Sequence, residues 1–255
     1  MPLDDPEGRP RATFLALLAL AVIACGPAVP SVPAPAAGEP DLLVARYSCG
    51  GPPGFEPSLF AEPGTAESED HPSAAALRVV LAERDPDFDF LPDAGWWLVA
   101  RDEGIARYIA RQPGDGPGQP MAHAEFEHQT GRWRITGWGD CRPTILLDEL
   151  SVASWVLDPA LPTPGRAATQ ISALVTEQVC TGGQAMGARL QAPRIAYTDD
   201  VVLVVFPVVP LGGAGNDCPG NPPTRVTFEL REPLGDRQLL DAAFFPPVEP
   251  VEPAR

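Results

Sequence analysis

Proline is the residue that most constrains how this chain can fold, because it occurs 33 times among 255 residues. The prolines cluster near the start, the middle and the end of the chain. Such clustering is typical of linkers and tails around folded modules, and not of a collagen-like or wholly disordered chain. With 44% hydrophobic and 20% charged residues, the chain is large enough for one big domain or two small ones.

The charged residues exclude several classes of function. All 18 basic residues are arginine, since lysine does not occur. A Schiff base, a Walker A phosphate loop and a Ser-Lys dyad each need an ε-amine and are therefore excluded. The formal net charge of −16 repels phosphate backbones, so we expect no nucleic-acid partner.

The N-terminal segment has the pattern of an export signal. Arg9 and Arg11 precede an apolar run over 13–24, which is too short to span a bilayer comfortably and ends in a lipobox-like Val-Ile-Ala-Cys at Cys25. We therefore expect residues 1–24 to be a lipoprotein signal peptide and Cys25 to carry diacylglycerol. An ordinary secretory signal and an uncut anchor helix are the alternatives.

Residues 25–40 follow as a proline-rich tether, extended over about 45 Å at ~3.1 Å per residue. Two acyl chains anchor a protein stably. The sequence thus predicts a chain held by lipid at the extracytoplasmic face of the cell membrane.

Outside the cytoplasm, the remaining cysteines predict disulfides. They are Cys49, Cys141, Cys180 and Cys218. Three connectivities exist, and we prefer Cys49–Cys141 with Cys180–Cys218 because each pair then lies inside one predicted domain. Cys49 as a reactive thiol is disfavoured, because no histidine lies near it in sequence.

Residues 41–144 are predicted to form an α+β domain, a small helix on a four-stranded antiparallel sheet. A strand is expected at 41–47 and a helix from 72 to about 84, capped by Asp70 or His71. Two hairpins follow, with strands at 95–101, 105–111, 121–128 and 132–138. Four of the five tryptophans fall here, and we interpret them as core residues before a stacking platform for sugars. They are Trp96, Trp97, Trp133 and Trp138.

Two groups in this domain are weak candidates for metal ligands. One is spaced like part of a calcium loop: Asp85, Asp87, Asp89 and Asp93. Phe90 replaces the turn glycine of that loop and Trp96 the final glutamate, so a solvated acidic edge is favoured. The other alternates along a predicted strand: His123, Glu125 and Glu127. A polar outer strand face gives the same pattern, so we expect no metal and no cofactor.

Residues 145–245 are predicted to form an all-β, sandwich-like domain with antiparallel strands. Strands are expected at 152–157, 169–180, 194–197, 201–209 and 225–230. The run at 201–206 is apolar on both faces, which places it centrally in a covered sheet. Residues 246–255 are proline-rich and are expected to form a disordered tail.

Several segments resemble uncharacterised secreted proteins and lipoproteins of high-GC Gram-positive bacteria. The segments that carry the likeness lie at 47–51, 91–96, 137–143, 180–183, 217–224 and 232–237. The group has no assigned activity, so the resemblance implies no functional residues.

No enzyme motif is recognisable: the sequence has no Gly-x-Ser-x-Gly, no His-Glu-x-x-His and no glycine-rich phosphate loop. We therefore expect no catalytic residues and favour a non-enzymatic envelope module that binds a protein or cell-wall ligand. The alternative is a carboxylate-dependent hydrolase acting on a cell-wall or glycan substrate, since paired carboxylates suffice for that chemistry.

Overall fold

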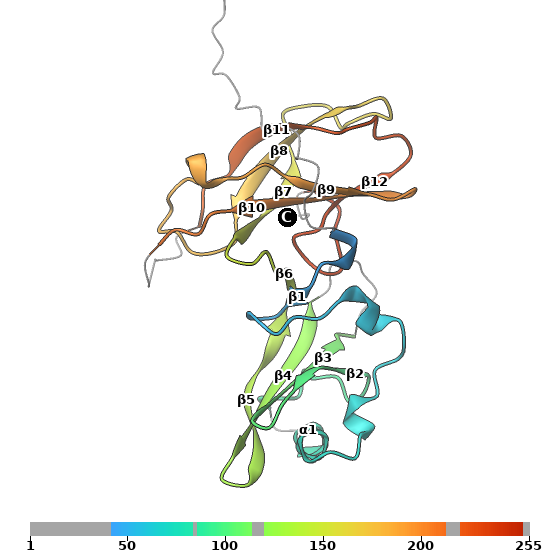
Figure 1. Cartoon of the computed structure of the whole chain (residues 1–255), viewed down its shortest axis with the longest axis vertical. Helices are drawn as coiled ribbons and strands as arrows, with labels where there is room; N and C mark the ends of the chain where they lie inside the picture. The colour runs from blue at the N-terminus through green and yellow to red at the C-terminus, as the bar shows by residue number, and fades with distance from the viewer. Residues whose placement is uncertain (1–41, 84–85, 114–119, 213–219, 252–255) are drawn as a thin grey trace, which may run out of the picture.

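The computed structural model of the chain describes residues 42–83, 86–113, 120–212 and 220–251. The predicted signal peptide and tether, 1–40, lie outside this part. Within it the chain is mostly β-structure with one α-helix, and its strands form a two-, a four- and a six-stranded sheet. Figure 1 shows the six-stranded sheet at the top, the four-stranded sheet below it and the pair β1–β6 between them.

Two short hairpins build the four-stranded sheet. Its antiparallel strands follow one another in chain order: β2 (Trp96–Arg101), β3 (Ile105–Arg111), β4 (Met121–Gln129) and β5 (Arg132–Cys141). All four lie where alternation predicted strands. The turn between β4 and β5 places Gly131 at φ +79°, in the left-handed region that glycine adopts without strain.

Helix α1 (Pro72–Glu83) begins at the predicted proline, and His71 caps it. The backbone N–H of Ser73 donates to His71 Nδ1 over 3.1 Å, which satisfies one of the free donors of the first turn. Further along the helix, Leu77 and Val80 belong to a buried cluster with side chains of β2, β3 and β4. The cluster includes Trp96, Tyr108 and Phe126.

The six-stranded sheet is centred on β10 (Val201–Val208), as the two-sided apolar run predicted. The other strands are β7 (Ser151–Leu157), β8 (Gln170–Glu177), β9 (Arg194–Tyr197), β11 (Thr224–Glu229) and β12 (Gln238–Asp241). β10 pairs antiparallel with β7 and β9 and parallel with β12, so this sheet is mixed. β12 was not predicted from the sequence.

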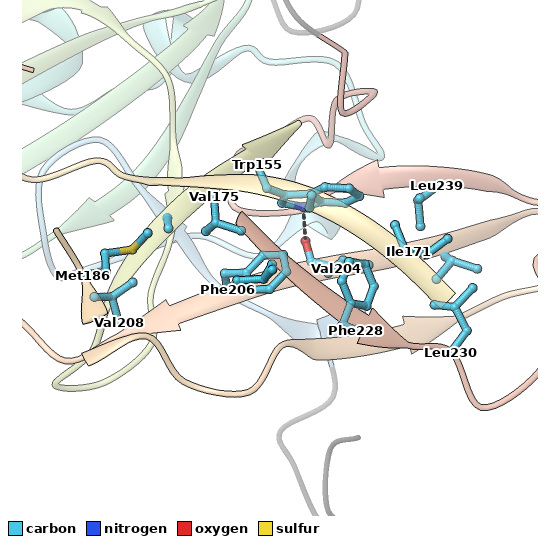
Figure 2. Close-up of a cluster of buried hydrophobic side chains, with 14 of the residues drawn as sticks. Trp155, Ile171, Val175, Met186, Val204, Phe206, Val208, Phe228, Leu230 and Leu239 are labelled. Carbon is cyan, nitrogen blue, oxygen red and sulfur yellow. Dashed lines mark hydrogen bonds between the residues drawn. The ribbon is translucent and has the colours of Figure 1, made fainter. Parts of the chain in front are cut away.

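Aromatic residues fill the core against this sheet (Figure 2). Trp155, Phe206 and Phe228 meet edge to face, with ring centroids 5.5–6.0 Å apart. Pairs of this geometry contribute about 1 kcal/mol each beyond the area they bury. The indole N–H of Trp155 donates to the carbonyl of Val204 over 3.4 Å, so its polar atom is satisfied inside the core.

A second cluster joins residues from both predicted domains. Tyr47 and Phe55 pack there with Val205 and Phe244, and Ile109 of β3 lies in the same cluster. The predicted boundary after residue 144 falls within β6 (Thr144–Ile145), which pairs with β1 (Tyr47–Ser48).

The chain ends of the described part differ from expectation in two places. The strand expected at 41–47 was wrong in its first half, because Leu42–Val44 form a 3-10 helix and β1 begins at Tyr47. In the predicted tail, residues 246–251 are described, and Val248 pairs with Asp241. Among the described residues, no helix is both long and apolar enough to cross a membrane.

Candidate functional site

A cavity of about 230 Å³ lies between the loop that follows β1 and one face of the four-stranded sheet. The loop contributes residues between 48 and 55, and the sheet contributes side chains of β2, β3 and β4 and the backbone of Gly137 on β5. The lining includes Ser48, Cys49, Phe55, Val99, Arg107, Ile109, His123, Glu125 and Gly137.

Strand alternation explains why these side chains meet. In β3 and β4, Ile109 lies opposite His123 and Arg107 lies opposite Glu125, so all four share the sheet face away from α1. On β5 the residue opposite Glu125 is Gly137. A glycine there leaves open space above the sheet, where any other residue would place a side chain.

The polar groups of the cavity are linked on one side and open on the other. The guanidinium of Arg107 donates Nε–H to Glu125 Oε2, and its Nη1–H donates to the carbonyl of Pro52 over 2.8 Å. Arg107 thus ties the sheet to the loop. His123 Nδ1 is buried and has no hydrogen-bond partner among the described residues. A buried polar atom without a partner costs about 1–3 kcal/mol, which a bound ligand can offset.

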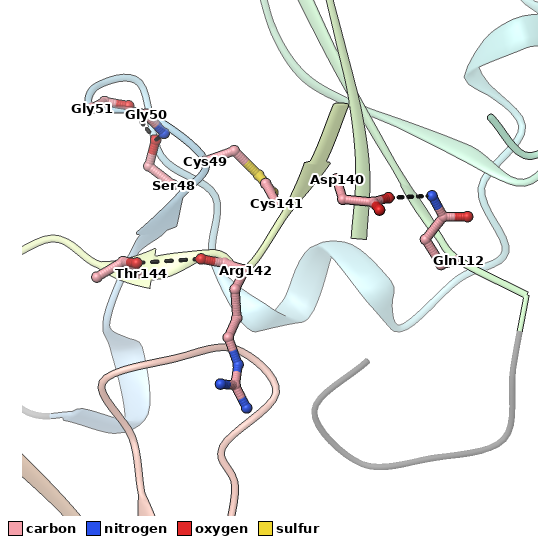
Figure 3. Close-up of a disulfide and its surroundings, with 9 residues drawn as sticks. All are labelled: Ser48, Cys49, Gly50, Gly51, Gln112, Asp140, Cys141, Arg142 and Thr144. Carbon is pink, nitrogen blue, oxygen red and sulfur yellow. Dashed lines mark hydrogen bonds between the residues drawn. A yellow bond between two sulfur atoms is a disulfide. The ribbon is translucent and has the colours of Figure 1, made fainter. Parts of the chain in front are cut away.

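A disulfide fixes the loop wall. Cys49 is bonded to Cys141 at the end of β5, with the two Cα atoms 5.6 Å apart, as the sequence predicted (Figure 3). Within the loop, Ser48 Oγ–H donates to the carbonyl of Gly51 and accepts from the N–H of Gly50. The cavity wall is therefore held in place before any ligand arrives.

Of the other predicted disulfide, only one cysteine lies among the described residues. Cys180 is disulfide-bonded, whereas Cys218 lies outside the described residues. The pairing Cys180–Cys218 stays a prediction.

The weak metal candidates are not brought into one cluster. Asp87, Asp89 and Asp93 are exposed, and Asp85 lies outside the described residues. Among the residues that the structure describes, no three His, Cys, Asp or Glu side chains are grouped to hold a metal.

On β4, Glu125 forms an ion pair with Arg107. Glu127 accepts a hydrogen bond from Gln129 Nε2 over 2.8 Å. His123 and Glu125 line the cavity, and Glu127 is not among its lining residues.

The tryptophans lie in different surroundings and do not form one stacking platform. Trp96 is fully buried and donates Nε1–H to the carbonyl of Pro92 over 2.8 Å, while Trp138 is 39% exposed beside Phe88. Trp133 packs between the rings of His71 and His128.

His71 also contacts a hydroxyl, in a pair that superficially suggests a nucleophile and its base. Ser73 Oγ lies 2.7 Å from His71 Nδ1 and 2.6 Å from the hydroxyl of Tyr108. Ser73 has no exposed surface. These bonds therefore cap α1 and attach it to β3, and they offer no nucleophile to a substrate.

A second hollow of about 480 Å³ lies beside β7 and β12 and is lined by Arg142, Trp155, Asp241 and Glu249. Both oxygens of Asp241 are engaged: the N–H of Trp155 donates to Oδ2 over 3.1 Å and the N–H of Ala243 to Oδ1 over 2.9 Å. Burial raises the pKa of Asp241 to about 7. The carboxyl group of Asp241 thus accepts bonds from the backbone of β7 and of the segment after β12, which is a structural role.

Sequence reasoning missed Arg107, Gly137 and Asp241. Asp241 had a recognisable signal, because it is one acidic residue within the apolar run 239–245. Arg107 and Gly137 are ordinary strand residues whose importance depends on what lies opposite them.

No protein family, curated protein or solved structure matches this chain.

Proposed function

We propose that this chain is an extracytoplasmic lipoprotein that binds a small ligand in the cavity beneath the 48–55 loop. The lipid on Cys25 would hold it at the membrane, and the 25–40 tether would keep the folded part clear of the lipid surface. In this proposal a helix-on-sheet module, 41–144, carries the ligand site. A sandwich-like module, 145–245, supports it through the shared core at Tyr47 and Phe244.

The observation that carries the binding function is the preformed cavity lined by the polar side chains of Arg107, His123 and Glu125. The disulfide and the bond from Arg107 to Pro52 fix both walls, so a ligand would meet little ordering cost. The cavity volume of about 230 Å³ is small for a ligand pocket, which favours a ligand of few atoms over a folded partner.

Binding is favoured over hydrolysis by the state of the carboxylates. A glycoside hydrolase needs two carboxyl groups free to act on the substrate. The cavity contributes one, Glu125, and Arg107 holds it. In the second hollow, Asp241 spends both oxygens on backbone N–H groups.

A thermal-shift screen of the purified chain against a library of small polar molecules tests the proposal. We expect at least one compound to raise the melting temperature of the wild type by several degrees. We expect no such rise for Gly137→Leu, whose side chain would fill the cavity. A Cβ at Gly137 meets Glu125 Cβ at 3.5 Å, an ordinary contact, so the backbone at this position has room for the first carbon of a side chain.

The matched control is Gly165→Leu, at an exposed glycine with nothing near its Cβ position. This variant should respond to compounds as the wild type does. Equal shifts in Gly137→Leu and the wild type would show that binding takes place elsewhere and would refute the proposed site.

A further inference from the structure

We infer that the ligand is a small zwitterion with an apolar side chain, the chemical class of free α-amino acids. This inference rests on the proposed function, because it names the ligand of the same cavity. It follows from the charges, the spare hydrogen-bonding capacity, the apolar wall and the size of the site.

The charged groups of the cavity come as a balanced set. Arg107 supplies one positive charge and Glu125 one negative charge, on neighbouring strands and in contact. A lone cation would be repelled by the guanidinium. A lone anion would meet the Glu125 carboxylate and the field of a chain with net charge −16. A ligand that carries both signs complements both groups.

Each group keeps capacity for a further bond. The contacts to Glu125 and Pro52 use two of the five N–H groups that a guanidinium carries. The bond from Arg107 reaches Oε2 of Glu125, and a carboxylate has a second oxygen that can accept. An ammonium group can therefore bind Glu125 while a carboxylate binds Arg107.

His123 adds the third polar contact. Its buried Nδ1 has no partner in the described part of the chain, and the ring lies diagonally across from Arg107 on the sheet. Residues in diagonal positions are about 7–8 Å apart at Cα, close enough for both side chains to bind one small ligand. A ring N–H of His123 that faces the cavity would donate to the ligand carboxylate.

The rest of the wall is apolar and limits the ligand's size. Phe55, Val99 and Ile109 line the cavity beside the polar groups, and they suit a branched aliphatic side chain. The volume of about 230 Å³ equals roughly eight water molecules at ~30 Å³ each, which matches a free amino acid better than a longer peptide.

The test compares three compounds that share one side chain and differ in charge: L-leucine, L-leucinamide and N-acetyl-L-leucine. Titration calorimetry on the purified full chain should show binding of the zwitterion. The amide lacks the carboxylate and the acetyl compound lacks the ammonium, so we expect each to bind at least tenfold more weakly.

Two variants of β4 locate the ammonium contact. Glu125→Gln should weaken leucine binding at least tenfold. Glu127→Gln removes the next carboxylate on the same strand, which does not line the cavity, and should leave binding unchanged.

If N-acetyl-leucine or leucinamide bound as tightly as leucine, the ligand would not be recognised as a zwitterion and the inference would be refuted. Equal losses of leucine affinity in Glu125→Gln and Glu127→Gln would refute it as well. If the library screen finds a cavity ligand that Gly137→Leu abolishes but leucine does not bind, the ligand class is wrong and the proposed function stands. If the screen finds none, the proposed function fails as well.

Discussion

At the scale of single residues, Asp241 links the folding of the chain to pH. Its carboxyl group is 1% exposed, and burial raises its pKa from 3.8 to about 7. Because the folded state binds this proton more tightly than the unfolded state, the stabilisation is complete below pH ~4 and is lost as the pH rises through 7. The pKa of Tyr47 is raised to about 12, mainly by burial and further by the negative charge of Asp241.

We therefore expect the free energy of unfolding to fall between pH 5 and pH 8, by at most about 3 kcal/mol from this group. In Asp241→Asn, which keeps the shape but cannot ionise, most of this dependence should vanish. Urea denaturation at the two pH values measures it. Asp199→Asn, at an exposed turn, is the control and should keep the wild-type slope. A wild type equally stable at both pH values would contradict the prediction.

An ion pair that joins the end of β8 to the 3-10 helix Gly187–Arg189 should be sensitive to the loss of one partner. Arg189 holds the fully buried side chain of Glu177 with two bonds, of 2.9 and 2.6 Å. Arg189→Met leaves that carboxylate unpaired, and we expect a loss of about 3–5 kcal/mol in urea denaturation. The double variant with Glu177→Gln should recover much of the loss, because the uncompensated charge is gone. An additive double variant would show that the pair itself contributes little.

At the scale of elements, the disulfide should hold both the fold and the cavity wall. It closes a sequence separation of 92 residues, so Cys49→Ala with Cys141→Ala should lower the free energy of unfolding by about 4 kcal/mol. The same double variant should bind a cavity ligand more weakly, since the loop wall loses its anchor at Cys49. Chemical denaturation and ligand titration measure the two effects. Unchanged affinity would mean that the Arg107 contact to Pro52 fixes the loop without help from the disulfide.

The elements themselves were largely predictable because each carries its own periodic signal. Alternation located the four strands between 95 and 141, and Pro72 with the apolar residues after it located α1. β12 (Gln238–Asp241) was not predicted, and it pairs parallel with β10 through a contact that local sequence does not encode. The sheet in which it lies is therefore mixed where antiparallel pairing was expected.

The candidate site was predictable only in fragments. His123 and Glu125 stood out by their spacing, and Cys49 by its predicted disulfide. A cavity, however, depends on which residues lie opposite one another. The pairing of Gly137 with Glu125 joins strands whose register a bulge shifts between Glu125 and Phe126. Local sequence does not reveal that combination.

At the scale of the whole molecule, the two sheets share one hydrophobic cluster around Tyr47, Val205 and Phe244. The ligand cavity lies next to this cluster, because Phe55 and Ile109 belong to both. Substitutions that loosen the packing between the two sheets should therefore also displace residues of the cavity wall. The cluster couples the stability of the two predicted domains, whatever their exact boundary.

The lipobox-like sequence at Cys25 predicts where this molecule resides. If Cys25 carries two acyl chains, the wild type should enter the detergent phase on fractionation, and mass spectrometry should find a lipid-modified N-terminal cysteine. Cys25→Ser should remove the modification, and the chain should then be unanchored or left uncleaved. Gly165→Leu, a change at an exposed position of the folded part, is the control and should keep the lipid. Ligand binding should be the same in wild type and Cys25→Ser, because the cavity draws on residues 48–137 and on none of the anchor. A wild type that fractionates as fully soluble with an unmodified Cys25 would refute the anchor and leave the ligand site to be judged by itself.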